Sequence, residues 1–354
     1  MIRAIVFFLG IFPLVAFAGK QVNIHQIISF GDSLSDANNK HLISLYMNQS
    51  SNNLISVRAL PPNVSGRFSN GFTWVDQLHI SFWRQPSVPA LKAINSTMVI
   101  EKAGENQSFQ LQVNPLTGSN WSVGGAMTGD GYLADETVAD GSTVISGTKV
   151  LPNVGQQISD YLAQHKQFTP TDLVLIQGGT NNLWFTLFAN QGDTGTSTAL
   201  KLVEHIKQLQ QHGAQHILVM NIPPLYLGAW LSPFHDQAKD FVDEFNQTLA
   251  NELGQLIQPQ SSTNIYLMDA DAFLAKVVKQ IQTKGEYYHH PTATRLSNVN
   301  DSAWNWVSNE VVDKPNQYIF WDGLHPTAAV HRLLAYHAEQ LLEQHGIIPA
   351  GIAK

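Results

Sequence analysis

Short runs of apolar residues recur along the chain, and turn-forming residues follow most of them. The first run stops at Gly31, the second at Gly178, and the third at Pro223-Pro224. Runs that are apolar at nearly every position are typical of strands buried on both faces, as in a parallel sheet. The predicted strands are residues 22–30, 172–177, 216–221 and 264–269.

Amphipathic segments lie between these runs. In one of them Phe241, Phe245, Leu249 and Leu253 recur at four-residue spacing, which places them on one face of a helix. The predicted helices are residues 154–165, 197–211, 236–257 and 327–345. Alternation of strands and helices with short connections predicts an α/β fold, a three-layer sandwich around a mostly parallel sheet.

Two regions interrupt this rhythm. Residues 47–118 are rich in Asn, Ser, Gly and Pro, and residues 283–316 carry aromatic residues without a clear period. Long irregular insertions in a compact domain often form binding loops or lids. No linker, internal repeat or low-complexity tract is evident, so we predict a single domain over residues 19–354 with irregular insertions near these two regions.

The first residues have the pattern of a signal peptide. Arg3 precedes an almost wholly apolar stretch, and Ala16-Phe17-Ala18 matches the small-x-small pattern before a cleavage site. The apolar stretch is short for a membrane span. We therefore predict a leader over residues 1–18, cleavage after Ala18 and a secreted or periplasmic protein, with a membrane-tethering anchor as the alternative.

Composition removes several classes of function. The formal net charge is −7 and no long basic block occurs, so nucleic acid is not an expected partner. The chain has no cysteine, which excludes disulfides, thiol nucleophiles and iron–sulfur clusters. No zinc-binding His-Glu-x-x-His and no phosphate- or dinucleotide-binding glycine loop is found, so we expect neither a metal nor a cofactor.

A serine occurs where a reactive group would be well placed. Ser33 lies in Phe30-Gly31-Asp32-Ser33-Leu34-Ser35-Asp36, directly after the first predicted strand, and this segment is expected to open a helix. The hydroxyl would lie at the carboxyl edge of the sheet, where open α/β folds bind ligands, and the N–H would suit an oxyanion. A serine that only caps a helix would give the same local pattern.

Asp322 and His325 supply the groups that such a serine needs. A serine hydroxyl is a poor nucleophile until a base takes its proton, and histidine is the usual base. Asp322 precedes His325 by three residues across a glycine-containing turn, so its carboxylate could orient the imidazole. By itself the segment also fits a plain turn followed by a helix start.

Two further segments offer hydrogen-bond donors for an oxyanion. Gly125 lies in the glycine turn of residues 120–126, and Asn181 follows the second predicted strand. A backbone N–H at Gly125 and the side-chain amide of Asn181 are suitable donors. Each segment alone also fits a packing turn or a polar loop.

With these motifs in this order, the sequence resembles the GDSL esterases and lipases, also called SGNH hydrolases. The resemblance rests on Gly31-Asp32-Ser33-Leu34, on Gly125, Asn181 and His325, on Asp322, and on the segment 66–74, and it runs from about Ile28 to His325. It implies a flavodoxin-like α/β/α fold and ester hydrolysis without metal or cofactor. It also implies that Ser33 is the nucleophile, His325 the base and Asp322 its partner. Ser33, Gly125 and Asn181 would form the oxyanion hole.

Within this family the chain looks most similar to bacterial exported phospholipases A, lysophospholipases and glycerophospholipid:cholesterol acyltransferases. The expected substrate is then a lipid ester, with transient contact to a membrane surface or micelle. Trp304 and Trp306 are candidate substrate-binding residues in an aromatic loop that is either an acyl-chain wall or lid, or an ordinary surface loop. Asn182 departs from the Asp common in relatives, which puts the rigidity of that loop in question.

Other functions stay open at this point. A carbohydrate O-acetyl esterase or a short-chain aryl esterase would use the same catalytic residues. A non-catalytic exported binding protein on the same fold is a third reading, against which the intact set of Ser33, Asp322 and His325 argues. The sequence does not define the oligomeric state.

Overall fold

The computed structural model describes residues 21–102, 105–134, 143–146, 149–189, 192–257 and 261–351. The predicted leader, residues 1–18, lies outside the described residues. None of the described helices is long and apolar enough to cross a membrane.

A parallel sheet forms the centre of the molecule, as the apolar runs predict. Its strands are β2 (Gln26–Phe30), β10 (Asp172–Ile176), β11 (His216–Met220) and β12 (Asn264–Met268). They lie in the order β12-β11-β10-β2, and every neighbouring pair is parallel. All residues of β10 and β11 are buried, because both faces of the sheet are covered.

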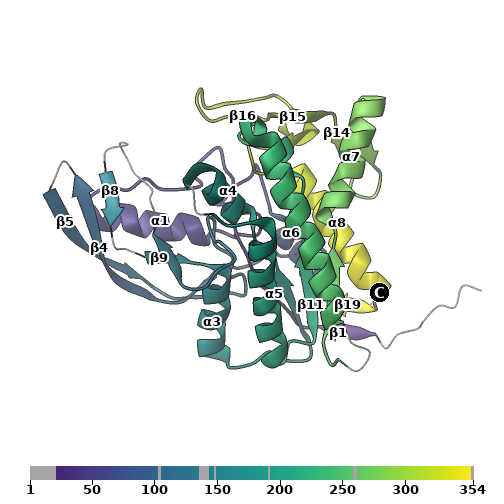
Figure 1. The fold of residues 1–354 in the computed structure, drawn as a ribbon, viewed down its shortest axis with the longest axis horizontal. Coiled ribbons are helices and arrows are strands. Elements are labelled where there is room, and N and C mark those ends of the chain that lie inside the picture. The colour runs from purple at the N-terminus through teal and green to yellow at the C-terminus, as the bar shows by residue number, and fades with distance from the viewer. Residues whose placement is uncertain are drawn as a thin grey trace, which may run out of the picture.

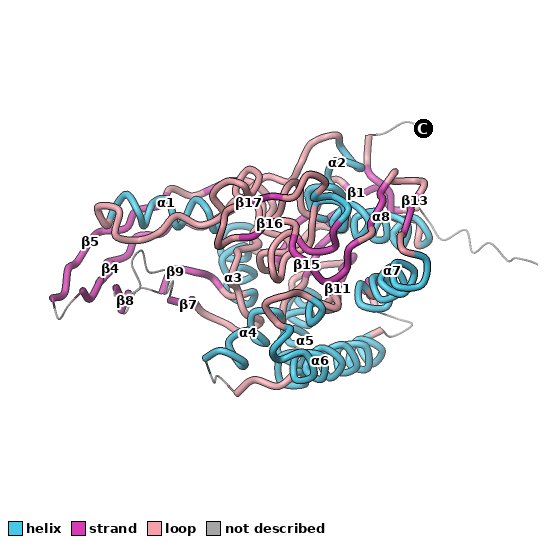
Figure 2. The backbone as a smooth tube through the Cα atoms, turned by 90° about the horizontal axis from the view of Figure 1, so that it is seen from above, coloured by secondary structure: helices cyan, strands magenta, loops and turns pink. Residues whose placement is uncertain are grey.

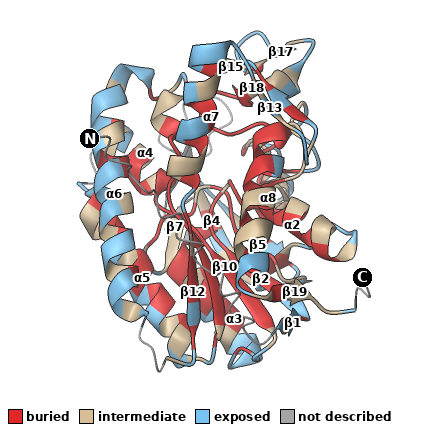
Figure 3. Cartoon of the chain, turned by 90° about the vertical axis from the view of Figure 1, so that its right-hand side faces the viewer, coloured by how far each residue is buried: buried red, intermediate tan, exposed pale blue. Residues whose placement is uncertain are grey.

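Helices cover the two faces of this sheet (Figure 3). On one side lie α5 (Gly195–Gln211) and α6 (His235–Leu256), and on the other α2 (Trp74–Trp83) and α8 (Ala328–Gln344). The predicted three-layer α/β sandwich is therefore confirmed. Helices α3 (Val154–His165), α4 (Thr180–Ala189) and α7 (Ala270–Lys284) complete the layers.

The first predicted strand is divided in two. β1 (Val22–Ile24) pairs with β19 (Ile347–Pro349), whereas β2 enters the central sheet. The exposed His25 lies between them, and its N–H donates to the Thr171 carbonyl over 3.0 Å. The prediction of one strand over residues 22–30 is wrong at this point because the chain changes its pairing partner there.

Residues 47–118 are more regular than expected. They contain α2 and a long antiparallel hairpin of β4 (Ile94–Lys102) and β5 (Glu105–Val113), which projects away from the central sheet (Figure 2). The buried side chains of Met98 and Leu111 face α1 (Asn39–Ser50) in a second, smaller core. The exposed face carries Asn, Ser and Gln, so the composition of this stretch resembles that of a loop although it forms a strand pair.

Residues 283–316 also form short strand pairs. β16 (Trp304–Asn305) pairs with β17 (Glu310–Val311), and β15 (Asn298–Ser302) pairs with β18 (Tyr318–Phe320). β15, β16 and α4 lie at the same end of the molecule, the upper end in Figure 1. The remaining elements are β3 (Ala90–Leu91), β6 (Leu116–Thr117), β7 (Tyr132–Ala134), β8 (Thr143–Ser146), β9 (Lys149–Pro152), β13 (Tyr287–His289), β14 (Thr294–Leu296), η1 (Leu225–Leu227), η2 (Ser232–Phe234) and η3 (Pro315–Gln317).

Candidate active site

Ser33 lies on a tight turn that follows β2. The turn is closed by the Asp36 N–H, which donates to the Asp32 carbonyl over 3.0 Å. Helix α1 begins only at Asn39, so the expectation that the motif opens a helix directly is wrong. Within the described part of the chain the Ser33 N–H makes no hydrogen bond, which leaves it available to a ligand.

The side chains of Ser33, His325 and Asp322 are bonded in series. His325 Nε2 lies 2.9 Å from Ser33 Oγ, and His325 Nδ1 lies 2.8 Å from Asp322 Oδ2. The second carboxylate oxygen of Asp322 accepts the N–H groups of Leu324 (2.8 Å) and His325 (2.7 Å). The carboxylate is thereby fixed by its own loop, and residues 292 positions apart in the sequence meet in one line.

The electrostatics suit a histidine that accepts a proton from Ser33. Burial by itself would lower the pKa of His325, but the charge and hydrogen bond of Asp322, with the charge of Asp32, raise that pKa above its ordinary value. The bond from Nδ1–H to Asp322 leaves the Nε2 lone pair for the Ser33 hydroxyl. For the carboxyl of Asp32, burial has the opposite effect and raises the pKa. Hydrogen bonds from the Leu34 N–H and the Gln177 amide partly counteract this rise.

Phe68 fixes the imidazole from a third direction. Its ring stacks on His325 at a centroid distance of 5.2 Å and an interplanar angle of 27°. Phe68 belongs to the segment 66–74 that carries part of the family resemblance, but sequence reasoning assigned it no role. Its position beside a histidine could not be read from spacing, since the two lie far apart in the chain.

The two other oxyanion-hole candidates lie close to each other. Asn181 is in the first turn of α4, and its Nδ2 donates to the Ala126 carbonyl over 2.9 Å, next to Gly125. Gly125 has φ +91°, a conformation that glycine adopts without strain. No hydrogen bond of the Gly125 N–H occurs among the described residues. One Asn181 proton and the Gly125 N–H are thus left for a substrate oxygen.

Asn182, the residue that departs from the family pattern, hydrogen-bonds the segments on either side of it. It is fully buried, its Oδ1 accepts the Thr128 N–H over 3.0 Å, and its Nδ2 donates to Asp193 Oδ2 over 2.8 Å. Asp193 is also paired with Lys201 at 2.9 Å. An Asp at position 182 would face the Asp193 carboxylate, so here the amide suits its surroundings and the loop is held.

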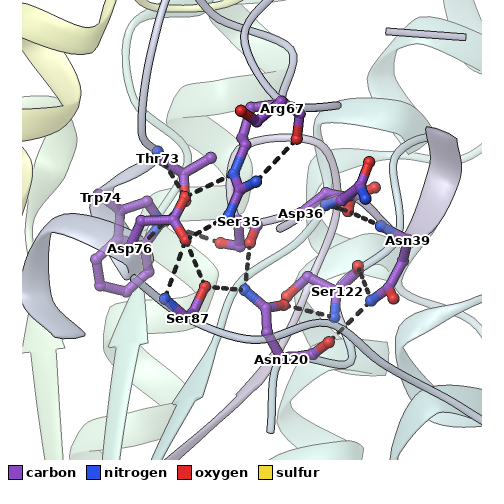
Figure 4. Close-up of polar contacts among 12 residues, drawn as sticks. Ser35, Asp36, Asn39, Arg67, Thr73, Trp74, Asp76, Ser87, Asn120 and Ser122 are labelled. Carbon is purple, nitrogen blue, oxygen red and sulfur yellow. Dashed lines mark hydrogen bonds and ion pairs between the residues drawn. The ribbon is translucent and has the colours of Figure 1, made fainter. Parts of the chain in front are cut away.

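Behind Ser33 lies a buried set of polar contacts, which we call the polar network (Figure 4). Asp36 connects the Ser33 turn to the glycine loop, because its carboxylate accepts the N–H groups of Gly124 (2.7 Å) and Asn39 (2.6 Å). Asn120 continues the connection by donating to the Ser35 carbonyl over 2.8 Å. The members labelled in the figure are Ser35, Asp36, Asn39, Arg67, Thr73, Trp74, Asp76, Ser87, Asn120 and Ser122.

A buried ion pair anchors the same network. Arg67 donates to both carboxylate oxygens of Asp76, each over 3.0 Å, and Asp76 is fully buried. Asp76 also accepts from Thr73 (3.0 Å) and from the Ser87 hydroxyl (2.6 Å), so its charge is well compensated. Sequence reasoning missed this pair; the nine-residue separation of Arg67 and Asp76 carries no periodic signal.

Trp304 and Trp306 lie beside the loop that carries Asp322 and His325. The ring of Trp304 stacks on that of the buried Trp321 at a centroid distance of 5.6 Å. The backbone N–H of Trp304 donates to the Trp321 carbonyl over 2.7 Å. Trp306 is 60% exposed and meets the edge of Trp230 at 6.4 Å. Over the described ranges neither tryptophan makes a ring contact or hydrogen bond with Ser33 or His325.

Among the residues that the structure describes, no group of three or more His, Asp or Glu side chains is placed to hold a metal ion. The site instead gathers a hydroxyl, an imidazole and a carboxylate in series, with Ser33 directly after the carboxyl end of β2 in a parallel sheet. An α/β fold with this constellation defines the class of serine hydrolases.

The chain belongs to the family described as GDSL-like lipase/acylhydrolase, whose model matches residues 27–338. This family is one of hydrolases that act on ester bonds. The chain is 24% identical to the thermolabile hemolysin of Vibrio parahaemolyticus, over 90% of this chain and 63% of the relative. It is 23% identical to a secreted effector protein of Salmonella typhimurium, over 91% of this chain and 65% of the relative.

A third relative is the phosphatidylcholine-sterol acyltransferase of Aeromonas hydrophila. It is 22% identical, and the match covers 90% of both chains. The present chain therefore spans just under two thirds of the hemolysin and of the effector, but most of the acyltransferase.

Proposed function

We propose that this protein is an exported serine esterase that hydrolyses lipid esters, as a phospholipase A or lysophospholipase, through an acyl intermediate on Ser33. The observation that carries the proposal is the series of short contacts from Asp322 to His325 (2.8 Å) and from His325 to Ser33 (2.9 Å). A hydroxyl that already touches a base whose tautomer is set is ready to lose its proton as it attacks.

In the first half of the reaction Ser33 Oγ attacks the ester carbonyl and its proton moves to His325 Nε2. The carbonyl oxygen becomes negative and accepts hydrogen bonds from the N–H groups of Ser33 and Gly125 and from Asn181. The tetrahedral species then collapses and the C–O bond to the alcohol breaks. His325 gives its proton to the departing oxygen, which leaves an acyl ester on Ser33.

In the second half a water molecule takes the place of the alcohol. It attacks the acyl carbonyl while His325 takes its proton, and the same donors stabilise the oxyanion. Collapse releases a carboxylic acid, and His325 returns its proton to Ser33. If an alcohol attacks in place of water, the outcome is acyl transfer, so the same residues serve a hydrolase or an acyltransferase.

Two observations support a lipid ester as the substrate in this proposal: the aromatic residues around the site and the name of one relative. The loop of Asp322 and His325 is flanked by Trp304 and Trp306, which we propose contact the acyl chain. The phosphatidylcholine-sterol acyltransferase, whose name states a lipid substrate, matches over 90% of this chain. A relative named as a secreted effector supports export through a leader over residues 1–18, which N-terminal sequencing of recovered protein would test.

Substitution of Ser33 tests the mechanism. Ser33→Ala should lower hydrolysis of a soluble aryl ester by several orders of magnitude and abolish labelling by a serine-directed phosphonate, with an unchanged thermal midpoint. The matched control is Ser108→Ala, which removes an exposed serine hydroxyl on β5, away from the site. Near-normal turnover or retained labelling of Ser33→Ala would remove Ser33 from the mechanism, and a non-catalytic binding protein should not react at all.

A substrate panel tests the lipid preference. Wild-type protein is compared on lysophospholipid, diacylphospholipid, a short aryl ester and an acetylated carbohydrate, with and without cholesterol as acyl acceptor. We expect the phospholipids to be cleaved at higher kcat/KM than the acetyl esters. A strong preference for acetyl groups would replace the lipid assignment with a carbohydrate or short-chain esterase.

A further inference from the structure

Five aromatic side chains from three separate segments meet in a continuous row, which we call the aromatic strip. Trp184 contacts Phe188 at 4.2 Å and Trp230 at 5.9 Å between ring centroids. Phe188 meets Phe234 at 5.1 Å, and Trp230 meets Trp306 at 6.4 Å. The row therefore runs from α4 through the segment of η1 and η2 to β16.

The five rings are uncharged; two of them are exposed, and Trp184, Trp230 and Phe234 are half-buried. Phe188 is 47% and Trp306 is 60% exposed, and the neighbouring Val307 is 77% exposed. The three segments that carry the strip, residues 180–189, 222–234 and 302–309, contain no Asp, Glu, Lys, Arg or His. The exposed residues Asp236, Asp301 and Glu310 lie just outside these segments. Large aromatic side chains grouped with so few charges are unusual for a face that only meets water.

The strip is continuous with the active site. The backbone N–H of Trp230 donates to the Gly323 carbonyl over 3.0 Å. The Trp230 indole also lies against Gly323, because a Cβ added at position 323 would come within 1.9 Å of the ring. Gly323 directly follows Asp322. On α4, Asn181, Trp184 and Phe188 have the spacing of one helix face, so the strip starts at the oxyanion-hole candidate.

We propose that the aromatic strip docks the enzyme on a zwitterionic lipid surface and presents the ester bonds of that surface to Ser33. Tryptophan and phenylalanine insert at the boundary between headgroups and acyl chains, which gives affinity without cationic residues. The net charge of −7 opposes approach to an anionic surface, so the matching surface is an electrically neutral one. This inference rests on the proposed lipid-ester function.

Vesicle flotation tests the docking separately from catalysis. The full chain carrying Ser33→Ala, which does not consume the lipid, is floated with phosphatidylcholine vesicles and compared with versions that also carry Phe188→Ala, Trp306→Ala or both. The matched control is Tyr288→Ala, which removes another exposed aromatic ring (39% exposed) on β13, outside the strip. Thermal midpoints verify that all variants are folded.

We expect each strip substitution to lower the vesicle partition coefficient about tenfold and the control to change it less than about twofold. In the Ser33 enzyme, Phe188→Ala, which lies outside the proposed acyl-chain contacts, should lose about tenfold more rate on vesicle lipid than on a soluble acetyl ester. The proposal is overturned if the chain does not float, if strip variants float like the control, or if only anionic vesicles bind. A change of oligomeric state in place of vesicle binding would assign the strip to a protein partner and also overturn it. Absence of soluble-ester hydrolysis would instead overturn the proposed function while leaving the flotation result to stand.

Discussion

Two regions next to the candidate active site are built in opposite ways. The polar network behind the serine is buried, and its charged and amide groups are hydrogen-bonded to one another (Figure 4). The aromatic strip next to the loop of Asp322 and His325 is partly exposed and has no charged residue in any of its three segments. The network joins backbone segments to each other, whereas the strip leaves its rings open to the outside.

The difference shows how one site combines fixed geometry with contact to a variable surface. Directional bonds such as those of Asp36 to Gly124 and Asn39 hold the nucleophile and the oxyanion donors at set distances. Apolar contact is non-directional, so the strip can meet a fluid surface without a fixed partner. Changes in the triad and network should thus affect every substrate, while changes in the strip should depend on how the substrate is presented.

The largest expected effects come from the triad, where Asp322→Asn tests the pairing of Asp322 with His325. The carboxylate sets the tautomer of His325, and its replacement should lower kcat on a soluble ester about 10⁴-fold, less than His325→Ala does. We propose neutral His325 as the active base, so we expect the rate of the wild type to rise with pH through a pKa raised above the ordinary 6.5. Without the Asp322 charge, burial dominates, the pKa of His325 falls, and the acid limb should move to lower pH in a kcat/KM profile. An acid limb at unchanged pH would show that Asp322 does not set the pKa of His325.

The second effect concerns stability. Arg67→Ala leaves the buried Asp76 carboxylate without its bidentate partner and should lower the free energy of unfolding by about 3–5 kcal/mol in urea titration. Arg295→Ala is the matched control, because its pair with Glu286 is about half exposed on both sides and should contribute less than about 1 kcal/mol. Equal losses in the two variants would show that the network does not depend on this pair.

Acid should lower the free energy of unfolding through buried histidines on the side of the polar network. The aromatic strip has no titratable side chain and should not contribute to this loss. Burial lowers the pKa of His331 to about 3 and that of His79 to about 4, so each remains neutral in the fold but binds a proton near pH 6.5 when unfolded. The unfolded chain then holds more protons, and stability should fall as pH drops below 6.5, by roughly 2 kcal/mol per histidine at pH 5. His79→Leu should remove about half of this loss, as measured by urea unfolding at pH 7 and pH 5. A loss unchanged by the substitution would exclude His79 as a cause.

The smallest expected effect lies where the glycine loop meets α4. Asn182→Asp places a second carboxylate against Asp193 and should reduce stability by about 1–3 kcal/mol and kcat by several-fold, because the Asn181 and Gly125 donors shift. The double variant Asn182→Asp with Asp193→Asn exchanges donor and acceptor and should recover most of both losses. No recovery would mean that the pair does not hold the loop.

The central sheet could be predicted because the residues of each strand by themselves show the pattern of a buried strand. Burial on both faces demands an apolar residue at nearly every position, and β10 and β11 meet that demand locally. The hairpin β4–β5 escaped the same reasoning. Only one of its faces is buried, against a small core that α1 completes from elsewhere in the chain.

The candidate site divides in the same way. Ser33, Asp322 and His325 could be chosen because the proposed chemistry calls for a hydroxyl, a base and a carboxylate, and because Asp322 and His325 share one short loop. Tertiary structure alone decided that Asp36 binds Gly124, that Asn182 binds Asp193, and that five aromatic rings form one strip. Those contacts join residues far apart in the chain, and side chains that meet only after the sheet has assembled impose no local pattern on the sequence.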